Sequence, residues 1–143
     1  MRFFVYFSYS LVSHLRHLRR NEYVKILYAL SSTLTLALGL LHMATTFTLA
    51  STPSAKVWFF GAGIAIALGG VLNLLNRRYG LAAFGLRVVC IGANVLMVCF
   101  AAVAGHLTGA SAAQQVVMLT LLASALILSA MRSACVSPQS PGA

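Results

Sequence analysis

Four long apolar stretches, separated by short polar segments, organise this chain. They run over about residues 26–49, 57–75, 82–104 and 113–131. Each is close to the ~20 residues that an α-helix needs to cross the hydrocarbon layer of a bilayer. Because backbone amides inside lipid must be satisfied within the protein, such stretches form helices, and the alternation typical of a membrane β-barrel is absent from the sequence. The pattern therefore predicts an all-α integral membrane protein.

The segments between the apolar stretches are short, at about residues 51–56, 76–81 and 105–112. Short connections make successive helices antiparallel neighbours. We therefore expect one transmembrane domain over residues 25–132, a four-helix bundle in up-down-up-down order. The remaining segment 133–143, with Pro138 and Pro141, is predicted to be a disordered cytoplasmic tail.

The first 24 residues combine apolar and basic side chains ahead of the first apolar stretch. As a helix they would carry one apolar stripe, formed by Phe3, Phe7, Leu11, Leu15 and Leu18. Basic side chains gather toward the end of this segment, at Arg16, Arg19 and Arg20. We hypothesise an amphipathic helix lying on the cytoplasmic leaflet. The alternatives are an unstructured basic leader, or residues encoded upstream of the start codon that the cell uses.

Composition excludes a soluble domain of this length. Of the 143 residues, 60% are hydrophobic and only 8% are charged, whereas soluble domains carry roughly 25% charged residues. The net charge of +9 would suit nucleic-acid binding, but the basic residues lie between apolar stretches and not along one solvated face. We expect the lipid bilayer to be the main partner, with anionic lipids at the cytoplasmic face, and no nucleic acid.

The distribution of Lys and Arg predicts the orientation. With both termini in the cytoplasm, nine of the ten basic residues lie inside and Lys56 alone lies outside, as the positive-inside rule requires. Trp58, Tyr28 and Tyr79 fall near predicted helix ends, where aromatic rings favour the membrane interface. The expected location is the cell membrane, the inner membrane of a bacterium or a plasma membrane, which the chain crosses as a multi-pass protein.

Polar side chains within the apolar stretches are the candidate functional residues, because placing them in lipid is costly. Arg87 and Asn94 share a helix face at seven-residue spacing, and Asn73 lies in the preceding helix. These three residues could form a polar pocket open to the cytoplasm. Alternatively, Arg87 extends back to the headgroups, as long basic side chains near helix ends do.

His42 is the candidate in the first apolar stretch. It lies on a seam of small and polar residues typical of helix packing, with Ser32, Thr35, Gly39 and Thr46. We interpret His42 as a packing residue that Gln114 or Gln115 could meet. A pair of histidines, His42 and His106, could in principle hold a haem iron, but the sequence lacks the oriented ligand set that metal sites use, so no metal or cofactor is expected.

Small residues follow one another at four-residue steps in the second stretch, at Gly61, Ala65 and Gly69. This spacing lets two helix backbones approach closely. The contact could lie within the bundle or between two copies of the chain. The cysteines predict no disulfide: Cys90 and Cys99 point to opposite faces of one helix and are interpreted as packing residues.

Absent residue types limit the function. The only acidic residue is Glu22, outside the apolar stretches. The length and four-span plan resemble those of small multidrug exporters, but the membrane-embedded Glu of that family has no counterpart here. Hydrolase chemistry would need a carboxylate to orient a histidine beside a serine. We therefore expect a non-enzymatic accessory or interaction protein, acting as a homo-oligomer or with a membrane partner. The alternative is a small transporter or channel for an anion or neutral solute.

Overall fold

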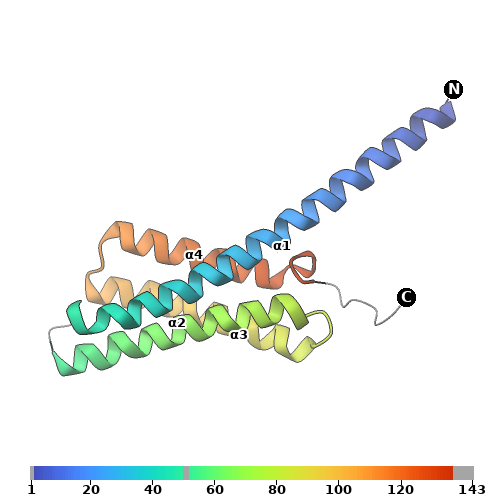
Figure 1. Cartoon of the computed structure of the whole chain (residues 1–143). Coiled ribbons are helices and arrows are strands. Elements are labelled where there is room, and N and C mark those ends of the chain that lie inside the picture. The colour runs from blue at the N-terminus through green and yellow to red at the C-terminus, as the bar shows by residue number, and fades with distance from the viewer. Residues whose placement is uncertain (1, 50–51, 137–143) are drawn as a thin grey trace.

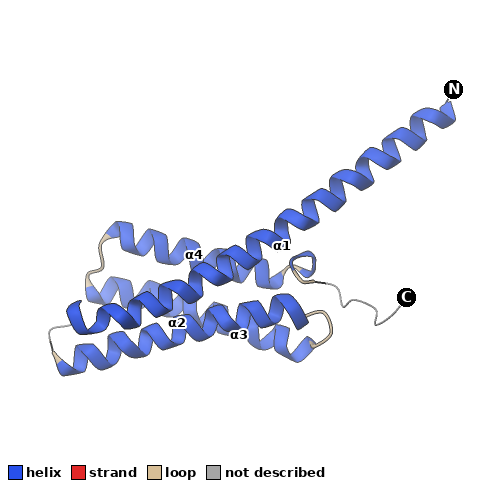
Figure 2. Cartoon of the chain, in the orientation of Figure 1, coloured by secondary structure: helices blue, strands red, loops and turns tan. Residues whose placement is uncertain are grey.

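The computed structural model describes residues 2–49 and 52–136, with side chains over residues 21–48 and 52–136. Every regular element in this part is a helix, and the connections between the helices are short (Figure 2). The elements are α1 (Arg2–Leu49), α2 (Pro53–Tyr79), α3 (Phe84–Thr108), α4 (Ala112–Ala130) and a short 3₁₀ helix, η1 (Arg132–Ala134). Each of the four α-helices contains a segment long and apolar enough to cross a membrane. The predicted all-helical class with four apolar helices is confirmed.

The helices run up and down beside one another, so their connections gather at two ends (Figure 1). The turn between α2 and α3 and the segment after α4 lie at one end, and the α3–α4 turn lies at the other. We call the first the basic end, because it holds Lys25, Arg77, Arg78, Arg87 and Arg132. Among the lysine and arginine side chains that the structure describes, only Lys56 lies at the other end, which we call the far end.

Local capping fixes where the helices begin and end. Thr52 precedes α2 and its Oγ1 accepts a hydrogen bond from the amide of Ala55 at 3.2 Å, while Pro53 occupies the first turn, where its missing N–H costs nothing. Ser111 and Gln114 form a reciprocal capping box at the start of α4. Gly109 ends α3 with a φ of 66°, a backbone conformation that glycine adopts without steric cost.

The α1–α2 interface is built from glycines that let the two backbones touch. A Cβ added at Gly70 would lie 2.5 Å from the backbone nitrogen of Leu36, and one at Gly63 would lie 2.9 Å from that of Met43. Neither position therefore has room for a side chain. In a membrane such close approach stabilises a helix pair through van der Waals contact, since lipid removes the hydrophobic driving force between helices.

The N-terminal residues are helical, but they do not form a separate element. α1 runs without interruption through the segment that was expected to be an interfacial helix, and it extends past the bundle at the basic end (Figure 1). The position of residues 1–24 on a leaflet stays a prediction.

The segment after α4 differs from the disordered tail that the sequence predicts. Residues 132–134 form η1, and both Ala134 and Cys135 are buried. The amide of Val136 donates a hydrogen bond to the carbonyl of Arg77 at 2.8 Å. Order arises here because the C-terminal end of α2 offers backbone carbonyls that the returning chain can bond. Residues 137–143, including both predicted tail prolines, lie outside the described residues.

Candidate functional site: a buried polar cluster

Buried polar side chains from all four helices meet in the half of the bundle nearer the basic end. We call this set the polar cluster; its members are Tyr28 of α1, Asn73 and Asn76 of α2, Cys90 and Asn94 of α3, and Ser129 of α4. None of these side chains is more than 3% exposed. Polar groups so far from water are stable only when they bond one another, so their partners show what the cluster can do.

The centre of the polar cluster is a reciprocal pair of amides. Asn73 Nδ2 donates to Asn94 Oδ1 at 2.9 Å, and Asn94 Nδ2 donates to Asn73 Oδ1 at 2.9 Å. Asn73 Nδ2 also donates to the carbonyl of Gly69, four residues earlier on α2, at 2.8 Å. This pairing joins α2 directly to α3, and each amide both donates through its Nδ2 and accepts through its Oδ1.

Tyr28 extends the network to α1. Its hydroxyl donates to Asn73 Oδ1 at 2.9 Å and accepts from Asn76 Nδ2 at 2.8 Å. The Cys90 thiol lies 3.4 Å from Asn73 Oδ1 as a further, weaker donor. The Asn73 side-chain oxygen therefore accepts bonds from groups on both α1 and α3.

Ser129 brings α4 into the same network. Its Oγ accepts from Asn94 Nδ2 at 3.1 Å and donates to the carbonyl of Leu126 at 2.7 Å. Hydrogen bonds thus connect Asn76 through Tyr28 to the reciprocal amide pair and from there to Ser129 of α4. Such a connected network rigidifies the helices that contribute to it.

Among the described side chains, one buried polar atom has no hydrogen-bond partner, the Oδ1 of Asn76. This oxygen lies against the backbone of Gly80, in the place that a Cβ at position 80 would occupy. Gly80 is therefore required by the Asn76 amide, because any side chain there would displace it.

The structure joins two of the sequence-predicted pocket residues and places the third elsewhere. Asn73 and Asn94 are in direct contact, but the described hydrogen bond of Arg87 goes to the carbonyl of Ala130, at the C-terminal end of α4. A guanidinium is favourable there because the last carbonyls of a helix carry partial negative charge. No described hydrogen bond links Arg87 to either amide, and the pocket of three residues stays a prediction.

His42 and the glutamines lie nearer the far end and have different partners. The His42 ring stacks on Phe59 of α2, with ring centroids 3.6 Å apart and an angle of 20° between the planes. Gln115 donates to the carbonyl of Ala101, and Gln114 caps its own helix. His106 is exposed in the last turn of α3. Among described residues, no three His, Cys, Asp or Glu side chains lie close enough to hold a metal ion.

The small-residue seam Gly61, Ala65 and Gly69 lies on the outside of α2. Gly61 and Ala65 are exposed, and a Cβ added at Gly61 or Gly69 would meet nothing within 4 Å. The contact within the bundle uses the adjacent face instead, with Gly63 and Gly70. Of the two contacts that the seam could make, the one between separate chains stays a prediction.

Four members of the polar cluster were not among the candidate residues: Tyr28, Asn76, Cys90 and Ser129. Tyr28 was assigned to the membrane interface because it lies near the start of the first stretch, and Asn76 to the connection after the second stretch because the apolar pattern stops before it. The three-residue spacing of Asn73 and Asn76 places both on one face of a longer helix. That spacing was the available signal.

Comparisons of this chain with protein-family models, with curated proteins and with solved structures find no match. The function therefore has to be argued from the chemistry of the site itself.

Proposed function

We propose that this chain is a non-catalytic multi-pass membrane protein that acts by binding a partner protein within the bilayer, as an accessory or structural component. The observation that carries the proposal is the polar cluster, whose amides and hydroxyls bond one another across all four helices. Groups engaged in this way hold helices together and present few free donors or acceptors to a solute.

The same contacts weigh against transport of an anion or neutral solute. That alternative requires Arg87 beside the two central amides, and its guanidinium bonds the carbonyl of Ala130 instead. A path for anions would then lack its cation.

The outward seam on α2 supports the choice of a helix as the partner. Gly61, Ala65 and Gly69 leave the α2 backbone accessible, and no described residue of the chain lies within 4 Å of a Cβ at either glycine. A helix of a second protein, or of a second copy, can approach such a surface closely. A partner bound there would contact α2 on the face that α1 leaves free.

The test is chemical crosslinking in intact membranes at native expression, followed by purification under denaturing conditions. We expect a crosslinked species that Gly69→Leu abolishes, because the added side chain would hold the partner helix away. Gly92→Leu is the matched control, since a Cβ at Gly92, as at Gly69, would meet nothing within 4 Å, but Gly92 lies on α3. Recovery of monomer alone would refute the proposal.

We further propose that the protein lies in the cell membrane with both termini in the cytoplasm. The support is the collection of the described basic side chains at one end of the bundle, with Lys56 as the exception. Reporter fusions after Ser54 and after Gly109 should both report from outside the cell. A cytosolic signal from either fusion would contradict this orientation.

A further inference from the structure

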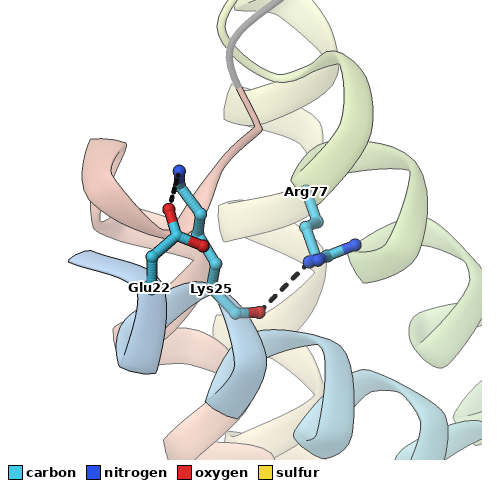
Figure 3. Close-up of polar contacts among 3 residues, drawn as sticks. All are labelled: Glu22, Lys25 and Arg77. Atoms are coloured by element: carbon cyan, nitrogen blue, oxygen red, sulfur yellow. Dashed lines mark hydrogen bonds and ion pairs between the residues drawn. The ribbon is translucent and has the colours of Figure 1, made fainter. Parts of the chain in front are cut away.

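The basic end has an excess of positive charge that no described carboxylate offsets. Its basic side chains come from α1, α2, α3 and η1, and the only acidic residue of the chain is Glu22. That carboxylate is already paired with Lys25 Nζ at 2.7 Å (Figure 3). Among the described residues, the arginines of this end are therefore left without an anionic partner.

The segment after α4 holds one of these arginines in a fixed position. The amide of Val136 bonds the carbonyl of Arg77 at 2.8 Å, and the Cys135 thiol donates to the carbonyl of Asn76 at 3.4 Å. Cys135 is only 2% exposed. Arg132 begins the same turn and remains exposed, so the buried part of the segment fixes the backbone from which its side chain extends at the surface of the bundle.

Two further arginines come to the same place from α2 and α3. The Arg87 guanidinium bonds the carbonyl of Ala130, two residues before Arg132. The backbone carbonyl of Arg77 accepts the bond from Val136 that anchors the segment. The Arg77 Nε donates to the carbonyl of Lys25 at 3.1 Å (Figure 3), which uses one of the five N–H groups of the guanidinium. Burial raises the pKa of the Cys135 thiol, and the charges of Arg87 and Arg77 lower it in part.

We propose that Arg77, Arg87 and Arg132 form a binding site for the phosphate group of an anionic phospholipid, assembled when the segment after α4 docks on α2. Guanidinium groups bind phosphate oxygens through paired N–H donors, which gives both strength and orientation. The site lies where the apolar helices end, and lipid headgroups occupy that depth in a bilayer. A lipid is therefore the source of phosphate that the position favours.

The first experiment measures lipid retained by the purified full-length protein. Native mass spectrometry in mild detergent, with phosphatidylglycerol and phosphatidylcholine added in equal amounts, should show preferential retention of phosphatidylglycerol. We expect Arg87→Gln and Arg132→Gln each to lower that retention about fivefold. Lys56→Gln at the far end is the control with the same change of charge, and it should leave retention unchanged. Equal retention of the two lipids, or equal loss in the Lys56 variant, would overturn the proposal.

A second variant tests the docked segment without changing any charge. Val136→Pro removes the N–H that bonds Arg77, and Cys135 already has the extended backbone that a residue before proline prefers, with φ −85° and ψ 150°. We expect Val136→Pro to lower phosphatidylglycerol retention, while Val136→Ala retains the lipid as the native protein does. Circular dichroism would verify that both variants keep their helices. If the proline variant retained the lipid fully, the docked segment would not build the site and the proposal would fail.

This proposal and the proposed partner binding fail separately. Partner binding was assigned to the α2 seam and is read from crosslinking, whereas lipid retention is read from the basic end of a single chain. Loss of one readout leaves the other unchanged.

Discussion

The reciprocal amide pair at the centre of the polar cluster makes a quantitative prediction. Asn73→Ala or Asn94→Ala would each remove both hydrogen bonds between the two amides and leave the opposite amide buried without that partner. Leaving a buried group unsatisfied costs about 1–3 kcal/mol. The double variant removes the second amide as well, so its cost should be smaller than the sum of the single costs.

The size of this difference follows from the two bonds that join the amides. Interhelical hydrogen bonds in membrane proteins contribute about 0.6 kcal/mol on average and about 1.7 kcal/mol at most. Two such bonds therefore predict a coupling energy of about 1.2 to 3.4 kcal/mol. The cavities left by the two alanines cancel in the cycle to first order, because each is present in one single variant and again in the double.

The assay is equilibrium unfolding in mixed micelles of mild detergent and dodecyl sulfate, followed by circular dichroism. The four proteins of the double-mutant cycle would be compared under identical conditions. Asn73→Ala combined with Thr45→Ala is the control cycle, since Thr45 bonds its own helix toward the far end. Distant sites should be additive within about 0.5 kcal/mol. An amide cycle that is equally additive would refute the view that these bonds hold α2 to α3.

Two further predictions concern individual contacts. Gly70→Ala should destabilise the protein by about 1–3 kcal/mol, because its Cβ would collide with the Leu36 backbone. Gly69→Ala should be nearly neutral in the same unfolding assay, because a Cβ there meets nothing within 4 Å. Equal effects of the two substitutions would contradict the packing described for α1 and α2. For Cys135, whose thiol pKa is raised above 9.0 by burial, the rate of maleimide labelling should still be increasing above pH 9.0. Because the pKa is raised, the contribution of this thiol to the free energy of unfolding is complete below pH 9.0 and is lost as the pH rises through the pKa of the folded state. A labelling rate that levels off below pH 9.0 would be inconsistent with a raised pKa.

The sequence predicted the helices well because their cause is local. Each apolar stretch has to satisfy its own backbone in lipid, so length and hydrophobicity alone define four helices. The structure extends α2 beyond its apolar part to Tyr79, and this extension carries Asn76 into the polar cluster. The hydrophobic pattern could not show this extension, because a polar residue at the end of an apolar stretch gives the same pattern whether it is buried or solvated.

The contacts between helices were predicted only in part. Asn73 and Asn94 belong to one of the two alternatives that the sequence left open, and their amides are in direct contact, since large polar side chains in the middle of a span need partners. The partner of Arg87 depends on how α3 and α4 are set against each other, which no local pattern specifies. The choice between Gly69 and Gly70 as the residue packed on α1 is also a matter of helix rotation.

The continuity of α1 has a mechanical consequence. A helix without a break has no hinge, so residues 2–20 follow every movement of the span to which they are joined. At 1.5 Å per residue, the 21 residues from Arg2 to Glu22 span about 30 Å, and a change in span tilt of about 20° would carry the end of this segment through about 10 Å. Small rearrangements inside the bilayer would therefore become large displacements outside it.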